Sequence, residues 1–230
     1  MREIVLDTET TGLDPADGHR IVEIGCVELF DHVPTGMTFH RYLNPERAVP
    51  IESHRVHGLT DEFLADKPLF GAIVDELELF LGDAPLVIHN AAFDIKFLNA
   101  EYTRLTRAHI PLSRAIDTIE IAKTKIPGAR YSLDELCKRF GIDLSARTKH
   151  GALLDAELTA RVYLELVGGR QTRLKLAPGD REENSSSPSA NGAARQRAHV
   201  LPVRITPEEE AAHRNFVSQE LGAGALWNAR

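Results

Sequence analysis

Two carboxylates spaced one residue apart stand at the end of an apolar run near the start of the chain. In the stretch IVLDTETTGLD, residues 4–14, three apolar residues lead to Asp7 and Glu9. Side chains at positions i and i+2 of a β-strand point to the same face, so these two carboxylates should lie side by side. Like charges repel, and removing them from water is costly without a compensating cation or donor. The pair is therefore expected either to face open water or to hold a metal ion.

Three further residues outside this strand have related chemistry. Asp94 falls in the first turns of a helix that follows the buried strand LVIH, and ligands bind at such strand ends in open α/β sheets. Asp155 lies three and seven residues before Leu158 and Val162, so it shares the apolar, core-facing stripe of its helix. His150 stands at the start of that helix. Singly, Asp94 could serve the helix dipole and His150 could be a capping residue, but the order of elements can bring them all together.

The donor set formed by Asp7, Glu9, Asp94 and Asp155 contains four carboxylates and no cysteine. Such hard oxygen ligands suit Mg²⁺ or Mn²⁺ rather than a structural zinc ion. Two such ions about 4 Å apart can clamp the attacking and leaving oxygens of a phosphodiester displacement. An unperturbed imidazole, with a pKa near 6.5, can take a proton from an attacking water at neutral pH, and His150 is the candidate for this role. These residues therefore predict metal-dependent phosphodiester hydrolysis.

The periodicity of the chain places these residues on strands and helices. After the first strand, the expected strands are 19–29, 39–45, 86–89 and the start of 115–122, which runs into a short helix. The expected helices are Phe70 to Leu81 with a stop at Gly82, the segment that carries Phe93, Phe97 and Leu98, residues 132–141 with a capping box of Ser132 and Glu135, and residues 151–169. Three antiparallel strands followed by strand–helix alternation predict a mixed α/β domain over residues 1–170.

The bulk composition is that of an ordinary globular protein. The 230 residues are 43% hydrophobic and 27% charged, and no apolar run approaches the roughly 18 residues of a membrane span. The N-terminus has no signal-peptide pattern, and Cys26 and Cys137 sit in apolar patterns as buried, reduced thiols. We therefore expect a cytoplasmic protein that does not associate with membranes. The net charge of −7 is a poor match for long nucleic acid, but a site that reads only a strand end remains possible.

The composition changes after Gly169. Residues 177–198 contain almost no large apolar side chain and read as a flexible linker. The tail contains VLPVRI, then a helix start at Thr206–Pro207 with Glu209, and Leu226–Trp227 near the end. So short a tail cannot build a core of its own, so its apolar residues are expected to meet a partner.

The motifs DTETTG, HNAAFD and HGALLDAEL, in this order, resemble those of the DEDDh (DnaQ-like) 3′–5′ exonucleases. Further segments, IVEIGCVE, VHGLTDEFLADKP, SLDELCKRF and RTKHGALLDAEL, resemble the epsilon-type proofreading branch of that family, which serves bacterial DNA polymerase III. The resemblance covers about residues 2–170 and the C-terminus. It implies an RNase H-like fold, a mixed five-stranded sheet flanked by helices, and removal of mismatched 3′-terminal nucleotides as 5′-monophosphates by two-metal-ion hydrolysis.

The resemblance also implies a role for each matching residue. Asp7, Glu9 and Asp155 would ligate two Mg²⁺ or Mn²⁺ ions, Asp94 would hold one through water, and His150 would be the general base. The resemblance also implies which residues contact the DNA 3′ end, whether that end is single-stranded or frayed. They are Asp7, Glu9, Thr10, Thr11, Gly12, Glu52, His57 and Asp155. Of these, Thr10 to Gly12 would act through backbone groups. Glu52 and His57, in IESHRVHG, could equally lie in a solvated loop.

Two partners besides DNA follow from the same resemblance. The segment QTRLKL, residues 171–176, is similar to the short peptide that docks replication proteins on the sliding clamp, with Gln171, Leu174 and Leu176 as the contacts. It would begin a linker over 171–198, and the tail over 199–230 would bind the polymerase III alpha subunit. A nuclease tethered in this way works at high effective concentration without gripping DNA itself, which is compatible with its acidic charge.

Two other functions are compatible with parts of the sequence. A stand-alone DEDDh nuclease that trims RNA or short oligonucleotides would need neither linker nor tail. An adaptor between polymerase and clamp, with a vestigial nuclease fold, would have no need of the complete acidic set. A Rossmann or P-loop enzyme is disfavoured because the chain has neither GxGxxG nor GxxxxGK[ST].

Overall fold

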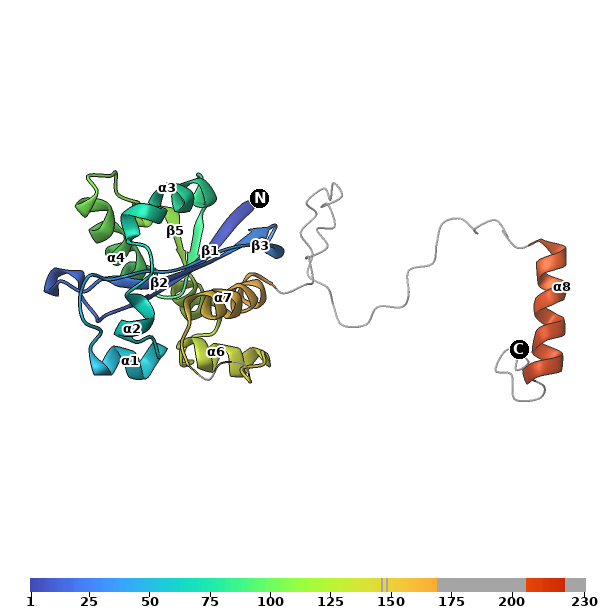
Figure 1. Ribbon diagram of the computed structural model, residues 1–230. Helices are drawn as coiled ribbons and strands as arrows, with labels where there is room; N and C mark the ends of the chain where they lie inside the picture. Colours follow the sequence, from blue (N-terminus) through green and yellow to red (C-terminus); the bar gives the residue numbers. More distant parts are fainter. Residues whose placement is uncertain (146, 148, 169–205, 222–230) are drawn as a thin grey trace, which may run out of the picture. The chain divides into compact units, whose positions relative to one another are not determined.

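The computed structural model of the chain describes residues 1–145, 147, 149–168 and 206–221. Its chain contacts divide it into two compact units, Met1–Lys175 and Leu176–Arg230, which are treated separately below. The first unit contains a sheet with seven α-helices, and the second contains α8 (Figure 1). No helix in the described ranges has both the length and the apolar composition needed to cross a bilayer.

The sheet of the first unit has five strands in the order β3-β2-β1-β4-β5. The strands are β1 (Arg2–Thr10), β2 (Ile21–Phe30), β3 (Val33–Tyr42), β4 (Leu86–Ile88) and β5 (Ala115–Asp117). The first three pair antiparallel, and β4 and β5 run parallel to β1. The predicted mixed five-stranded sheet flanked by helices is confirmed, with β1 at its centre.

The helices follow the strands in the predicted alternation. They are α1 (Ile51–His57), α2 (Asp61–Leu64), α3 (Phe70–Leu81), α4 (Ala91–Arg104), α5 (Thr118–Lys125), α6 (Leu133–Phe140) and α7 (Ala152–Val167), with 3₁₀ turns at Pro15–Asp17 and Leu112–Arg114. In the second unit α8 (Pro207–Phe216) continues into a π-helical turn, Val217–Leu221. The helix start predicted at Thr206 is confirmed, because Thr206 and Glu209 form a capping box there.

The central strand sends alternate side chains into two different cores. Ile4 and Leu6 join the core that contains residues of α3 and α4, whereas Val5 joins the core that contains Ala156 and Tyr163 of α7. Figure 1 shows the sheet between these helices. Because side chains alternate along a strand, the odd-numbered Asp7 and Glu9 emerge on the face that α7 covers.

Three local predictions are wrong or incomplete. The third strand covers Val33–Tyr42 rather than 39–45, because its first half is an exposed edge that has no buried alternation to mark it. The predicted capping box does not form: the Ser132 side chain makes no cap hydrogen bond, and the Glu135 side chain pairs with Lys138 at 3.0 Å. The segment IESHRVHG, considered as a solvated loop, forms α1 and the turn after it.

Other predictions concern residues that the structure does not describe. Residues 169–205 and 222–230 include the clamp-binding candidates Gln171, Leu174 and Leu176 and most of the apolar tail residues. They lie outside the described residues, so those predictions stay predictions. Cys26 and Cys137 are buried free thiols, as expected.

Candidate active site

The five residues with predicted catalytic chemistry line a single cleft of about 600 Å³. Asp7 and Glu9 come from β1, Asp94 from the first turn of α4, and His150 and Asp155 from the start of α7 and the residues before it. All four carboxylates are buried except Asp7, which is half-buried. The fold thus brings together residues that lie up to 148 positions apart in the chain.

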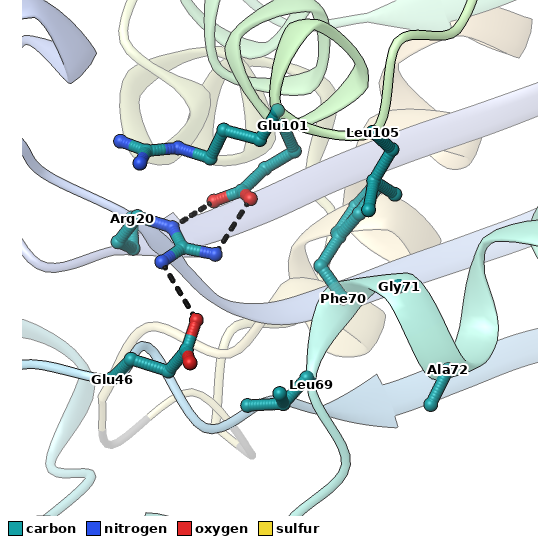
Figure 2. A pocket seen from close by; sticks show the side chains of 9 residues that line it. Arg20, Glu46, Leu69, Phe70, Gly71, Ala72, Glu101 and Leu105 are labelled. Carbon is teal, nitrogen blue, oxygen red and sulfur yellow. Dashed lines mark hydrogen bonds and ion pairs between the residues drawn. The ribbon is translucent and has the colours of Figure 1, made fainter.

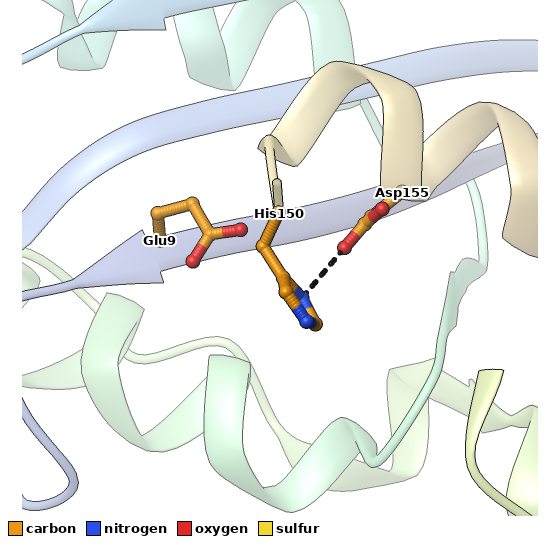
Figure 3. Close-up of side chains that lie close together, drawn as sticks. All are labelled: Glu9, His150 and Asp155. Carbon is orange, nitrogen blue, oxygen red and sulfur yellow. Dashed lines mark ion pairs between the residues drawn. The ribbon is translucent and has the colours of Figure 1, made fainter. Parts of the chain in front are cut away.

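Glu9, His150 and Asp155 form the tightest group in this cleft. Each of the three offers a ligand atom, and these atoms all lie within 4.8 Å of one another. His150 Nδ1 is 3.1 Å from Asp155 Oδ2. Figure 3 shows the strand residue and the two α7-side residues turned toward one another. Such spacing is compatible with ligation of one cation by two or three of these groups.

Asp94 is fixed at the cleft by its neighbours on two elements. Its Oδ1 accepts a 2.7 Å hydrogen bond from the hydroxyl of Thr8 on β1. The start of α4 is held by Asp117, whose carboxylate accepts the backbone N–H groups of Asn90 at 3.3 Å and Ala91 at 3.0 Å. Asn90 itself has the left-handed conformation, with φ = 71°. The turn from β4 into α4 therefore places Asp94 at the end of the sheet.

The start of α7 reaches the cleft because the sheet has no side chain in its way. A β-carbon on Gly25 of β2 would lie 2.3 Å from Ala152 C, which is far inside van der Waals contact. Gly25 is also the strand neighbour of Asp7. Before the helix, the backbone N–H of His150 donates to the carbonyl of Val56 in α1 at 3.2 Å. Close packing on β2 and a tie to α1 together set the position of His150 and Asp155.

Three of the carboxylates are protonated more readily than ordinary carboxylates. Burial, reinforced by the charges of Asp155 and Glu23, raises the pKa of Glu9 to about 8. Burial raises the pKa of Asp94 to about 7, although hydrogen bonds from Thr8 oppose the rise. Burial and the neighbouring carboxylates raise the pKa of Asp7 well above its usual range. A site that concentrates negative charge in this way is one that a divalent cation would stabilise.

Asp155 differs from the other three carboxylates because a cationic side chain already faces it. Burial raises its pKa, but hydrogen bonds from Arg147 and His150 outweigh that effect and leave the pKa of Asp155 below its usual value. Arg147 Nε lies 2.6 Å from Asp155 Oδ1, and Arg147 Nη2 lies 2.6 Å from Asp155 Oδ2. A guanidinium bound at this carboxylate is direct evidence that the cleft accepts positive charge. The carboxylate oxygens, the raised pKa values of three carboxylates and the guanidinium held at the fourth all indicate that a divalent metal ion would fit this cleft.

The predicted backbone contacts to DNA lie at the turn after β1. Thr11 is fully buried, and its Oγ1 accepts a 3.0 Å hydrogen bond from the backbone N–H of Arg20. Thr10 Oγ1 donates to the carbonyl of Gly12 at 2.6 Å. A β-carbon on Gly12 would lie 2.3 Å from the His19 ring. The two threonine side chains therefore shape the turn, and the backbone N–H of Thr11 also donates to the Arg20 carbonyl at 2.9 Å, so a substrate would meet the remaining backbone groups.

Glu52 and His57 do not line the cleft. Both belong to α1, where Glu52 is exposed in the first turn and His57 is buried at the C-terminal end. His57 Nδ1 accepts from the Leu59 backbone N–H at 3.0 Å, and its Nε2 has no hydrogen-bond partner among the described residues. Burial lowers the pKa of His57. The tie between α1 and His150 places this helix beside the site, so both roles stay predictions.

Several cleft residues had not been singled out from the sequence. Leu13 is 84% exposed beside Asp7 and Glu9, and Phe93, Asp134 and Arg147 also line the cleft. An exposed leucine directly after a threonine–threonine–glycine turn is a weak signal of an apolar contact with a base. Arg147 has no periodic pattern around it, so only the fold reveals that it meets Asp155.

A second cavity, of about 480 Å³, shares no lining residue with the acidic cleft, and an ion-paired arginine lines it. Figure 2 shows Arg20 between two carboxylates on its floor and rim. Arg20 Nε lies 2.6 Å from Glu101 Oε1, and its Nη1 lies 3.2 Å from Glu46 Oε2. Glu101 is buried on α4, and Arg20 is the residue directly before β2. This ion pair joins α4 to the strand that adjoins Thr11 and has a structural role.

Sequence comparisons agree with the geometry of the cleft. A family model described as Exonuclease (RNase_T) matches residues 4–163. A protein of Rickettsia felis, DNA polymerase III subunit epsilon, is 50% identical over 224 residues, which cover 96% of this chain and 97% of that protein. The DNA polymerase III subunit epsilon of Escherichia coli K12 is 43% identical, with 99% of this chain and 98% of that protein covered.

Solved structures with a similar fold are also exonucleases. Exonuclease X, in complex with 5′-overhanging duplex DNA, has a TM-score of 0.57 and 27% identity, covering 71% of this chain and 90% of that chain. The nuclease domain of 3′hExo, a DEDDh family member bound to rAMP, has a TM-score of 0.63 and covers 72% of this chain and 91% of that chain. At 21% identity the second similarity concerns the fold alone.

Proposed function

The chain belongs to the exonuclease family and, over nearly its whole length, to the DNA polymerase III epsilon subunits, and from that premise we propose how its cleft works. It is a metal-dependent 3′–5′ exonuclease. We infer that it removes mismatched 3′-terminal nucleotides as 5′-monophosphates. The observation that carries this proposal is the convergence of Asp7, Glu9, Asp94, His150 and Asp155 on one cleft.

In this proposal the carboxylates hold two divalent ions, Mg²⁺ or Mn²⁺. Asp7, Glu9 and Asp155 ligate them directly and Asp94 acts through water; when bound, the ions supply charge stabilisation to the attacking and leaving oxygens. Support comes from the raised pKa of Glu9 and Asp94 and from the all-oxygen carboxylate set. Thr8 keeps Asp94 turned into the cleft through its 2.7 Å hydrogen bond.

His150 is proposed as the general base that takes the proton of the attacking water. Its imidazole is 47% exposed, so water reaches it, and it lies within the same 4.8 Å group as Glu9 and Asp155. The 3.1 Å contact of Nδ1 with Asp155 orients the ring. The other ring nitrogen, Nε2, lies 3.4 Å from Arg147 Nη2. A base that its neighbours orient and that water reaches is suited to proton transfer.

The proposed substrate contacts surround the metal site. The backbone of Thr10, Thr11 and Gly12 would meet the terminal nucleotide, and Glu52 and His57 of α1 would contact it from the side of His150. His57 supports this placement, because a buried ring nitrogen without a partner among the described residues is costly unless a ligand satisfies it. A terminal nucleotide must leave its duplex to enter the cleft, and unpairing costs least at a mismatch.

The partners are proposed from the relatives' names and the organisation of the chain. Residues 1–170 would form the exonuclease domain, 171–198 a linker that begins with the clamp-binding peptide Gln171–Leu174–Leu176, and 199–230 a tail for the polymerase alpha subunit. The break between compact units near residue 175 supports this division. A protein that works within the bacterial replication machinery would be cytoplasmic.

The test follows the shortening of 5′-labelled substrates with Mg²⁺ or Mn²⁺ and identifies the released nucleotides by chromatography, using the full chain and Asp7→Ala. The substrates are a primer–template with a 3′ mismatch, the same duplex fully paired, a DNA single strand, and an RNA strand of matched sequence. We expect 5′-mononucleotides to appear faster from the mismatched and single-stranded ends, and none with Asp7→Ala or EDTA. Equal rates on the paired duplex, or release from the 5′ end, would contradict proofreading. Faster release from a matched RNA strand than from DNA would favour the stand-alone RNA trimmer.

A further inference from the structure

Arg147 occupies the position where a cation at Asp155 would be expected. Its guanidinium binds both carboxylate oxygens of Asp155 at 2.6 Å, through Nε and Nη2. The same Nη2 lies 2.8 Å from His150 Nδ1, and Nη1 donates to Asp134 Oδ1. The Arg147 side chain is only 8% exposed, so it is an internal part of the cleft. Every described contact of this guanidinium is with a residue that lines the active site.

A divalent ion and this guanidinium compete for the same atoms. Asp155 is 4% exposed, and both of its oxygens are already hydrogen-bonded to Arg147. Asp155 Oδ2 also contacts His150, which is a member of the group able to hold a metal ion. Two cations a few ångströms apart in a partly buried site repel each other strongly, so the divalent ion and the guanidinium disfavour each other there.

The contact with Asp134 gives the guanidinium a second partner. Asp134, on α6, has a side chain that is 47% exposed, so it stays in contact with solvent while it pairs with Arg147. Arg147 is therefore held between a buried carboxylate that belongs to the metal site and an accessible carboxylate that does not. An arginine placed in this way can give up one partner without being left as an uncompensated buried charge.

Building on the proposed metal-dependent function, we propose that Arg147 is an exchangeable counter-cation. It holds Asp155 ionised and in place, and it yields that carboxylate to a divalent ion while Asp134 retains the guanidinium. Arg147 thereby lowers the affinity of the site for metal and sets the concentration of free divalent ion at which the nuclease becomes loaded. Arg147 thus sets the metal affinity of the site through its contact with Asp155.

A purely structural role for Arg147 predicts the opposite effect on metal binding. In that case Arg147 would only tie its own loop, where its N–H donates to the Leu144 carbonyl at 2.9 Å, to α7. Its removal would then loosen Asp155 and His150 and weaken the metal site. The sign of the change in metal affinity separates the two roles.

The experiment measures Mn²⁺ binding to the full chain from the electron paramagnetic resonance signal of free Mn²⁺, with no substrate present. We expect Arg147→Gln to bind Mn²⁺ on the order of tenfold more tightly than wild type, a difference of about 1.4 kcal/mol. Arg147→Lys keeps the charge but not the bidentate geometry, so its affinity should lie between the two. Arg139→Gln is the matched control, because Arg139 is an exposed arginine of α6 that does not line the cleft.

A double-mutant cycle tests the role of Asp134. Asp134→Asn should weaken Mn²⁺ binding severalfold in the wild-type background, because the guanidinium then depends on Asp155 alone. In the Arg147→Gln background the same change should have a much smaller effect. Thermal unfolding gives an independent measurement, since Arg147→Gln should gain more stability from Mn²⁺ than wild type gains. If Arg147→Gln does not fold, Arg147→Lys and the Asp134→Asn change remain as tests.

The outcomes distinguish this inference from the proposed function. Weaker or unchanged Mn²⁺ binding by Arg147→Gln, with normal binding by wild type, would overturn the exchange role and leave the metal mechanism intact. Equal effects of Asp134→Asn in both backgrounds would also overturn it. A wild-type chain that binds no Mn²⁺ would overturn the metal site itself, and the role of Arg147 with it.

Discussion

Gly25 lies so close to Leu153 that a β-carbon built on the glycine would be 2.2 Å from the backbone nitrogen of Leu153. This contact joins the middle of β2 to the first turn of α7. Gly25 pairs with Asp7 in the sheet, and Leu153 precedes Asp155 by one half-turn. The absence of one methyl group therefore sets the distance between the carboxylates of the strand and those of the helix.

Gly25→Ala should move α7 outward and separate Asp155 and His150 from Glu9. Misplacement of catalytic groups by about 1 Å can cost on the order of 10²-fold in rate, and we expect a loss of that size in single-turnover nucleotide release, together with weaker Mn²⁺ binding. Gly71→Ala is the control, because a β-carbon there meets only the flexible end of Leu105 at 3.2 Å. Comparable activity of Gly25→Ala and Gly71→Ala would show that the packing distance does not limit catalysis.

Asp7→Ala and Asp155→Ala should both abolish nucleotide release but differ in stability. Burial and the neighbouring carboxylates raise the pKa of Asp7, so removing this carboxyl should leave the melting temperature unchanged or higher. Asp155→Ala takes from Arg147 its more buried carboxylate partner and leaves it only Asp134, so the melting temperature should fall. Calorimetry with EDTA present measures this difference. Equal melting temperatures of the two variants would show that the Arg147 pair contributes nothing to stability.

His150→Gln should slow the reaction without preventing metal binding. Glutamine keeps a polar side chain but provides no usable base, and removal of a general base costs on the order of 10²–10⁴ in rate. With saturating metal, the wild-type rate should rise with pH as the imidazole becomes neutral and then level off, and the variant should lose that rise. The measurement is the single-turnover pH–rate profile of both proteins. Identical rates and profiles would make His150 a bystander.

Glu9 should make the chain less stable as pH rises when EDTA removes metal. Its pKa is raised from 4.5 to about 8 in the folded chain, so between these values the folded chain holds a proton that the unfolded chain releases. The free energy of unfolding therefore falls as pH rises from about 5 to 8. Asp94, with a pKa raised to about 7, acts in the same direction. Thermal melts at pH 5 to 8 should show a shallower fall for Glu9→Gln than for wild type, and parallel curves would rule out this linkage.

Deletion of residues 177–230 should separate catalysis from assembly. The first compact unit contains the whole cleft, so the truncated chain should degrade free single strands at nearly the full rate. It should no longer bind the polymerase alpha subunit in a pull-down or gel-filtration assay, because the tail's apolar residues are gone. An unfolded truncated chain, or one that still binds the polymerase, would contradict the two-part organisation.

The parts of the site with a strong local pattern could be predicted from the sequence. The burial of Asp155 followed from its place on a stripe with helical spacing, and the location of Asp94 followed from the buried strand before it. The helix α1 has no such signal, because it begins after Pro50 without any side-chain cap. The first half of β3 is an exposed edge without alternation, and it was missed for the same reason.

Contacts between distant segments could not be predicted in this way. A glycine within a strand indicates a close approach of some backbone, but only the fold shows that α7 approaches Gly25. Arg147 likewise lies in an irregular loop, and its two carboxylate partners are on α6 and α7. The roles of single charged residues in loops depend on three-dimensional neighbours that no local pattern encodes.

The order of the site residues along the chain has a consequence for biosynthesis. Asp7, Glu9 and Asp94 leave the ribosome early, whereas His150 comes directly before α7 and Asp155 lies in α7, the helix that also covers one face of the central strands. A growing chain that already contains Asp7, Glu9 and Asp94 should therefore not hydrolyse DNA. It should become active only when α7 has emerged and packed on the sheet. Fragments that end before residue 150 should be inactive on single-stranded DNA, so that only completely translated nuclease domains would be able to degrade DNA in the cell that makes them.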